Sequence, residues 1–192
     1  TILEQRYPIY ELIFLDDHSR DASVRVPREK LTAAQTDCQF VVNEHNSGSV
    51  FSQWKKGVDL ARGDYVWIAE ADDAADPEFL SEVMKGFEPP DVVLSYCESK
   101  QMDENGCILA DNYLDYVSDI GAARWHRPFI KDGAHEIREA LSVKNTIPNV
   151  SGVVFRKSGL QSVLNEHMPN ILSFRVAGDW LVYVLLLRDG KI

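Results

Sequence analysis

Short apolar runs alternate along the chain with segments that have helical spacing. The run at 10–15 (YELIFL) ends in two aspartates, and further runs follow at 40–43, 65–69 (YVWIA), 92–96 and 153–155. Runs of this length are typical of strands buried on both faces of a sheet. Between them, apolar residues recur every three or four positions and predict helices over 50–61 and 79–87. The pattern predicts an α/β fold with a mostly parallel, mixed central sheet flanked by helices.

Turn-forming residues mark the expected boundaries of these elements. Gly63 and Asp64 predict a turn between the first long helix and the next strand. Asp76 and Pro77 predict the start of the second helix, with a capping side chain and a proline in its first turn, and the prolines at 89–90 predict its end. Pro27 predicts that the segment 21–36 forms two short pieces.

The pattern is weaker between about 99 and 148, where polar turns such as 103–106 (DENG) accompany an aromatic and basic stretch at 125–127 (WHR). We therefore expect a single domain over 1–192, divided into a first half (1–98), a variable lobe (99–148) and a second half (149–192). The opening TILEQ resembles the last turn of a helix, and the chain closes directly after an apolar helix. We expect a domain that is truncated at both ends.

Composition narrows the classes of function. The 192 residues are 45% apolar, which is enough for one sizeable core. The net charge of −10 argues against nucleic acid as a partner, because binding to a phosphate backbone needs basic contacts. An acidic protein that handles phosphorylated substrates usually needs a divalent cation to screen its carboxylates. The three cysteines show no CxxC spacing, and no run approaches the roughly 18 apolar residues of a membrane span. We expect a soluble cytoplasmic protein.

Two acidic clusters carry the candidate chemistry. Asp16 and Asp17 follow the first apolar run, and Glu70 and Asp72 follow the run at 65–69. Parallel strands bring their carboxyl ends to one rim of a sheet, which is where ligands bind in such folds. Residues two apart in an extended backbone point to the same side, about 6–7 Å from one another. Glu70 and Asp72 can therefore share one Mg²⁺ or Mn²⁺, whose open positions would bind a diphosphate.

Simpler interpretations of these acids remain open. Carboxylates after strands often cap helices or solvate turns, and Asp73 can brace the turn before Asp76. A metal-dependent phosphoryl or nucleotidyl transferase is a second hypothesis, although His18 stands where an aspartyl-phosphate hydrolase would need an aspartate. A third hypothesis is a non-catalytic module that binds nucleotide sugars.

The order of the motifs resembles that of the family 2 glycosyltransferases. The chain has LDDHS at 15–19, NSG at 46–48, ARGDYVWIAEADD at 61–73 and DPEFL at 76–80, and later NVSGVVFR at 149–156 and AGDWL at 177–181. The resemblance implies the GT-A fold, in which 1–98 is the nucleotide-binding half and 149–192 is the acceptor-side half. It also implies a nucleotide-sugar donor linked to UDP, GDP or dTDP, and a glycan or lipid-linked acceptor.

Roles for individual residues follow from the same resemblance. It implies that Asp16 and Asp17 contact the base and ribose of the nucleotide, and that Glu70 and Asp72 stand for the Asp-x-Asp metal motif, with Asp72 the direct ligand. Asp179 would be the general base of a single in-line displacement that inverts the anomeric carbon. Because Asp179 precedes the apolar segment 181–187, it can also serve as a first-turn acid of a buried helix.

Several positions depart from the family pattern. Glu70 replaces the usual aspartate, and Gln53-Trp54-Lys55 replaces Ala-Arg-Asn, so Lys55 or Lys56 could contact the diphosphate instead of the arginine, or could belong to a solvated helix face. The family's first strand, one wall of the base pocket, is missing. Trp180 could stack on an acceptor sugar, although core packing is the more common role of tryptophan. The family setting implies synthesis of a cell-envelope polysaccharide, at the inner face of the membrane.

Overall fold

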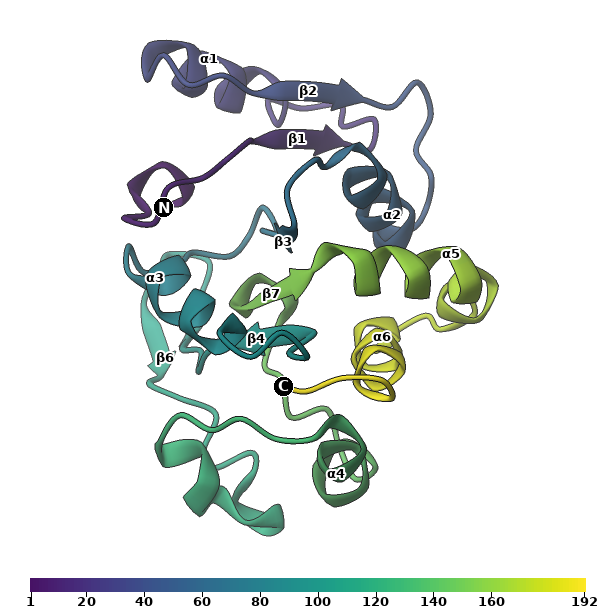
Figure 1. The fold of residues 1–192 in the computed structure, drawn as a ribbon. Coiled ribbons are helices and arrows are strands. Elements are labelled where there is room, and N and C mark those ends of the chain that lie inside the picture. Colours follow the sequence, from purple (N-terminus) through teal and green to yellow (C-terminus); the bar gives the residue numbers. More distant parts are fainter.

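Two sheets carry the fold (Figure 1), and their strands include all five of the predicted segments. The computed structural model describes residues 1–192 except the side chain of Ala122. The first sheet pairs β1 (Ile13–Asp16) with β2 (Gln39–Val42), and the second has the order β3-β7-β4. Its strands are β3 (Tyr65–Trp67), β7 (Val153–Arg156) and β4 (Leu94–Tyr96).

The strand directions agree only in part with the prediction of a mostly parallel sheet. β1 and β2 are parallel, but β7 runs antiparallel to both β3 and β4. A parallel partner needs a crossover that returns the chain to the same end of the sheet, usually through a helix. β7 instead follows the long lobe, and it enters the sheet between two strands that run the other way. The fold is α/β with mixed strand directions, as predicted, but its ladders form a parallel pair and a separate antiparallel trio.

The predicted helices are present. α2 (Val50–Leu60) buries Trp54 and Val58, and it approaches β1 so closely that a Cβ on Gly57 would lie 2.9 Å from Leu15 Cδ1. α3 (Phe79–Val83) continues as the 3-10 turn η2 (Met84–Phe87), which ends just before the two prolines. Ahead of α3, Asp76 Oδ1 accepts a hydrogen bond of 2.9 Å from the backbone N–H of Glu78. This bond closes a turn ahead of the helix, because the N-cap of α3 is Glu78 and the helix begins at Phe79. The prediction that Asp76 caps the helix, with Pro77 in its first turn, is therefore wrong.

The prediction of two short pieces over 21–36 is wrong. Arg25–Ala33 forms a single helix, α1, and Pro27 is its third residue. Proline lacks an N–H, but the N–H groups of a helix's first turn have no intrahelical acceptor, so Pro27 costs no hydrogen bond there.

The core lies between the second sheet and two helices near the carboxyl end, α5 (Lys157–Ser173) and α6 (Gly178–Leu187). Figure 1 shows α2, α5 and α6 gathered beside β7. α6 is apolar almost all round and is mostly buried, as predicted, with Val182, Tyr183 and Leu187 fully enclosed. Within the described part of the chain, no helix is long and apolar enough to cross a membrane.

The segment 99–148, predicted as a variable lobe, has only short elements of its own. A hairpin joins β5 (Gln101–Met102) to β6 (Ile108–Ala110), and Gly106 in its turn has φ +79°. The lobe then continues through four short helical elements: η3 (Ser118–Ile120), η4 (Ala122–His126), α4 (Gly133–Glu136) and the π-helical turn η5 (Ile137–Leu141). Trp125 Nε1 donates to the hydroxyl of Tyr96 at 2.9 Å, which ties the lobe to β4.

Candidate active site

An acidic cluster follows β3. Glu70, Asp72 and Asp73 each offer one carboxylate oxygen, and these oxygens all lie within 4.8 Å of one another. The predicted convergence of Glu70 and Asp72 is confirmed, and Asp73 joins them, a residue whose sequence context suggested only a brace for the next turn. Oxygen ligands at this separation fit the donor set that Mg²⁺ or Mn²⁺ requires.

A buried turn before β7 fixes the backbone at Glu70. The N–H of Glu70 donates to Ser151 Oγ at 3.0 Å, and the Ser151 carbonyl accepts a hydrogen bond of 2.8 Å from Trp67 Nε1. Ser151 is buried in η6 (Val150–Gly152), the turn that leads into β7. Sequence reasoning gave Ser151 no role, because its importance depends on the pairing of β3 with β7.

The electrostatics of the cluster favour a bound cation. Burial raises the pKa of the half-buried Glu70, and the negative charges of Asp72, Asp73 and Asp179 raise it further, while the indole N–H of Trp54 opposes them. Carboxylates that repel one another in this way are relieved by a positive charge among them. The charge of Asp179 acts on Glu70 although the two residues lie far apart in the sequence.

Asp179 belongs to the first turn of α6, and the packing of that turn determines its position. The preceding Ala177 has φ +62°, and Gly178 touches α2 so closely that an added Cβ would lie 2.5 Å from the ring of Phe51. Asn145 Nδ2 donates to Asp179 Oδ2 at 3.1 Å. Asn145, a lobe residue that sequence reasoning did not select, thus holds one oxygen of the carboxylate.

The side chains of Asp16 and Asp17 organise the loops at the end of β1. Asp16 is buried, and its Oδ1 accepts a hydrogen bond of 2.9 Å from the N–H of Ser19. Asp17 accepts four hydrogen bonds, from the following groups: Asn43 Nδ2 (2.6 Å), Ser47 N (2.8 Å), Ser47 Oγ (2.7 Å) and Gln53 Nε2 (2.9 Å). Burial alone would raise the pKa of Asp17, but these donors together lower it. Asp17 therefore shapes the loop that enters α2, and its contact with a nucleotide stays a prediction.

The two candidate lysines point in different directions. Lys55 Nζ lies 2.5 Å from Asp59 Oδ2, and Asp59 Oδ1 accepts from Gln161 near the start of α5. β7 is antiparallel to β3, and α5 begins directly after β7. The start of α5 therefore lies near the start of β3, at the opposite end of the strand from Glu70. Lys56 Nζ instead donates to Asn43 Oδ1, beside Asp17. The structure thus does not bring Lys55 to the predicted diphosphate site, and Lys56 is the lysine that faces the loop.

Trp180 is held by the protein core. Its Nε1 donates to the carbonyl of Leu141 at 2.9 Å, and its half-buried ring packs against the main hydrophobic cluster. This matches the packing role that was the more common expectation. Stacking on an acceptor sugar stays a prediction.

Two buried donors beneath the acids were also missed. The indole N–H of Trp54 has no partner at full hydrogen-bond geometry, yet it lies close enough to Glu70 to lower the pKa of that carboxyl. The hydroxyl of Tyr183 is likewise buried without a partner, and burial, followed by the charges of Asp179 and Glu70, raises its pKa. Both residues look like ordinary core aromatics in the sequence.

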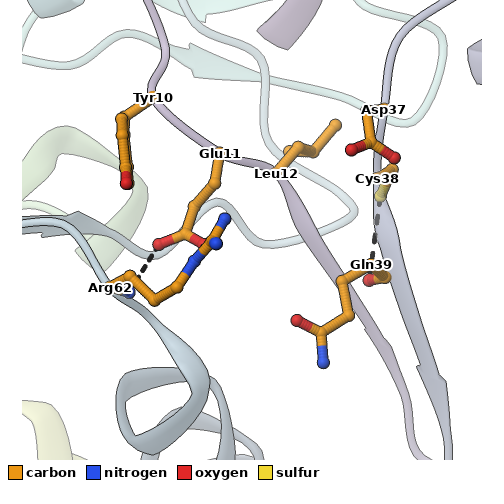
Figure 2. A pocket seen from close by; sticks show the side chains of 7 residues that line it. All are labelled: Tyr10, Glu11, Leu12, Asp37, Cys38, Gln39 and Arg62. Carbon is orange, nitrogen blue, oxygen red and sulfur yellow. Dashed lines mark hydrogen bonds and ion pairs between the residues drawn. The ribbon is translucent and has the colours of Figure 1, made fainter.

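A separate hollow lies elsewhere (Figure 2). It encloses about 370 Å³ at the amino-terminal ends of β1 and β2, away from Asp16, and its lining includes Tyr10, Glu11 and Arg62. Figure 2 shows Glu11 facing Arg62, and its carboxylate accepts from the backbone N–H and Nε of Arg62. Burial opposes these contacts, which together lower the pKa of Glu11. This ion pair is structural, so the candidate site rests on the acidic cluster and not on a cavity.

Comparison with known proteins identifies the family. No curated protein matches the chain. The sequence profile described as "Glycosyl transferase family 2" matches residues 1–152, a span that includes Asp16, Asp17, Glu70 and Asp72 and stops short of Asp179. The match covers more than three quarters of the chain, in agreement with the acidic strand ends and the α/β architecture, and the chain therefore belongs to glycosyl transferase family 2.

Proposed function

We propose that this protein transfers a sugar from a nucleotide-diphosphate donor to a hydroxyl of a glycan or lipid-linked acceptor, with inversion and with metal assistance. Family membership supports glycosyltransferase activity in general. The observation that carries the finer proposal is the convergence of Glu70, Asp72 and Asp73 beside Asp179. A metal-binding triad next to a separate carboxylate supplies a cation site and a base.

Asp72 and Glu70 would hold Mg²⁺ or Mn²⁺, with Asp73 as a third oxygen donor. When bound, the cation would stabilise the negative charge on the leaving diphosphate. Asp72 is exposed and can reach an incoming donor, whereas Glu70 is half-buried and anchored through Ser151. Asp72 is therefore the better candidate for the ligand that the diphosphate meets first.

Asp179 would act as the general base. Its Oδ2 accepts from Asn145, and within the described part of the chain no protein donor reaches Oδ1, which leaves that oxygen to accept a proton. The acceptor oxygen would attack the anomeric carbon as its proton passes to Asp179. The bond from that carbon to the diphosphate would break, and the diphosphate would leave with the electron pair. A single displacement of this kind inverts the anomeric configuration.

The nucleotide would lie along the end of β1, against Asp16 and Asp17, with Lys56 rather than Lys55 beside the diphosphate. Asp17 fixes the loop that would meet the base, and the bond from Lys56 to Asn43 keeps a cation on this side. The acceptor would approach between the lobe (99–148) and the acceptor-side half (149–192), near Trp180. Cell-envelope polysaccharide synthesis on the cytoplasmic face of a membrane is the setting we propose.

Binding measurements test this proposal. UDP-, GDP- and dTDP-sugars are titrated calorimetrically with and without Mn²⁺, against the unaltered protein, Asp72→Ala and the exposed control Asp115→Ala. We expect Mn²⁺ to strengthen the binding of one donor class, and Asp72→Ala to remove that enhancement while Asp115→Ala retains it. The absence of metal-enhanced binding for all three classes, or its survival in Asp72→Ala, would contradict the proposal.

Asp179→Asn separates transfer from the two other hypotheses. A transferase should keep donor binding and lose turnover in this variant, because only the proton acceptor is removed. A module that binds nucleotide sugars should show no turnover even without the substitution. With a nucleotide sugar as the substrate, a phosphoryl or nucleotidyl transferase would cleave the pyrophosphate bond and release a nucleoside monophosphate or a sugar phosphate instead of a nucleoside diphosphate.

A further inference from the structure

Asn43, the residue directly after β2, joins three segments at the carboxyl end of the parallel pair. Its backbone N–H donates to the carbonyl of Asp16 at 2.9 Å, and its own carbonyl oxygen lies 3.2 Å from His18 Nδ1. In its side chain, Nδ2 donates to Asp17 Oδ1 at 2.6 Å, and Oδ1 accepts from Lys56 Nζ of α2. All four polar groups of Asn43 are therefore used, and they bind the loop after β1 to α2.

The contact with Asn43 orients the Lys56 ammonium without neutralising it. The acceptor is an uncharged amide oxygen, and within the described part of the chain no carboxylate forms an ion pair with Lys56. An ammonium has three N–H donors, so the bond to Asn43 leaves the others for an anion. Lys55, one residue earlier, is instead paired with Asp59 at 2.5 Å. Of these two neighbouring lysines, Lys56 is the one whose charge is held in place and still available.

The chemistry of its two partners fixes the amide of Asn43 in one orientation. The NH₂ group faces the carboxylate of Asp17, and the oxygen faces the ammonium of Lys56. A flipped amide would set an acceptor against the carboxylate and a donor against the ammonium. Asp17 is itself bound by the backbone N–H of Ser47 and by Gln53 Nε2. A continuous chain of hydrogen bonds from the end of β1 thus determines where the ammonium lies.

We propose that Asn43 is a positioning residue that holds Lys56 for the diphosphate of the donor. Lys56 lies one hydrogen-bonded residue away from Asp17, on the loop where the proposed function puts the nucleotide. A lysine that is already ordered has less rotamer freedom to lose when an anion binds, so the contact with Asn43 raises the affinity for the diphosphate. This inference rests on the proposed function, since it assigns a support to a proposed diphosphate contact.

The alternative is that Asn43 only stabilises the loop after β1. Damage to that loop would weaken the binding of a nucleoside and of its diphosphate alike. A displaced Lys56 would weaken the binding of the diphosphate and leave that of the nucleoside unchanged. The ratio of the two affinities therefore isolates the contribution of the diphosphate and separates the two roles of Asn43.

A double-mutant cycle between Asn43→Ala and Lys56→Met tests the inference. The affinities of uridine, guanosine and thymidine and of their diphosphates are measured by NMR titration with Mg²⁺ present. We expect Lys56→Met to lower the ratio of diphosphate to nucleoside affinity roughly tenfold, as the loss of a hydrogen bond to a charged group predicts. Asn43→Ala should lower it roughly fivefold when Lys56 is present, and less than about twofold in the Lys56→Met background.

Lys55→Met is the matched comparison, and it should leave the ratio unchanged because Lys55 is paired with Asp59. An equal effect of Asn43→Ala in both backgrounds, no effect in either, or a larger loss in Lys55→Met than in Lys56→Met would overturn the inference and leave the proposed function intact. Failure of the unaltered protein to bind any of the three diphosphates would overturn the proposed function, and the inference with it.

A second measurement leaves Asn43 unaltered and keeps the inference testable if Asn43→Ala does not fold. The side-chain NH₂ group of Asn43 gives a pair of signals in the ¹H–¹⁵N spectrum. Lys56→Met, at an exposed position, should shift this pair, and the bound diphosphate should shift it more in the unaltered protein than in Lys56→Met. A pair of signals that responds equally to the diphosphate in both proteins would overturn the inference.

Discussion

At the scale of single residues, the bond from Asn145 to Asp179 links the lobe to the proposed base. Asn145 Nδ2 reaches Asp179 Oδ2 at 3.1 Å, and Asn145 Oδ1 accepts from the N–H of Ile147, so both ends of the amide are used. A carboxylate held through one oxygen keeps the other in a fixed direction. The orientation of the base therefore depends on a segment that sequence reasoning left without a functional role.

We predict that Asn145→Ala lowers kcat about tenfold with little change in donor affinity, because only the orientation of the base is lost. Asn145→Asp should lower kcat at least as far, because it removes the donor and places a negative charge beside Asp179.

Thr146→Val is the matched control, since the Thr146 hydroxyl is buried next to Asn145 and has no partner. Steady-state kinetics give kcat for Asn145→Ala, Asn145→Asp and Thr146→Val. A kcat of Asn145→Ala equal to that of the unaltered protein would refute the contact.

The acids of the site could be predicted from the sequence, and their supports could not. Asp16, Asp17, Glu70 and Asp72 stand directly after apolar runs, so strand periodicity alone predicts that they lie at the ends of strands. Ser151 and Asn145 act through contacts with residues far away in the chain, and no local pattern marks them. Lys55 and Lys56 are a different case, because adjacent helical residues point about 100° apart and only the packing of α2 decides which one faces the loop.

Among the helices and strands, α1 and β7 differ from what their own residues predicted. The sequence correctly predicted five strands and the helices α2 and α3, because their apolar spacing is regular. Pro27 predicted a break that does not form, because a proline in the first turn of a helix does not interrupt its hydrogen bonds. The direction of β7 was not encoded in its own residues: the sequence VVFR is compatible with either direction, and its neighbours decide.

α6 meets α2 where Gly178 packs against the ring of Phe51. Gly178→Ala should press a methyl group into Phe51, because its Cβ would lie 2.5 Å from the ring. The first turn of α6 would have to shift, and it carries Asp179. We expect a loss of roughly 1–3 kcal/mol in the free energy of unfolding, measured in urea, together with a fall in kcat.

Gly159→Ala in α5 is the control for this prediction. Its Cβ would meet only the end of the flexible Leu186 side chain, at 3.3 Å, while the substitution gains helix propensity. Its stability should change by less than about 1 kcal/mol. Equal losses in both variants would mean that the contact with Phe51 is not the cause.

At the scale of the whole molecule, the proposed site brings acids of one sign together within a protein that is already acidic. The net charge is −10, and the acidic cluster follows the end of β3. Burial, together with Asp72, Asp73 and Asp179, raises the pKa of Glu70 above that of the unfolded chain. A carboxyl with a raised pKa contributes less stability as pH rises through its unfolded and then its folded value. The metal-free fold should thus be weakened at neutral pH by the groups that would bind the cation.

Glu70→Gln tests this opposition between stability and binding. Without metal at pH 7, the variant should melt about 2–4 °C higher than the unaltered protein, because an amide removes the like-charge repulsion and the cost of burying a charge. Below the unfolded pKa of glutamate, where Glu70 is protonated in both states, the difference should vanish. Adding Mn²⁺ with nucleotide at pH 7 should raise the melting temperature of the unaltered protein and have much less effect on Glu70→Gln, since stabilisation by a ligand follows its affinity for the folded state. Glu104→Gln, in the exposed turn between β5 and β6, should change neither result. If Glu70→Gln were less stable than the unaltered protein at pH 7 without metal, Glu70 would be a structural residue of the fold and not a carboxylate held in place for a cation.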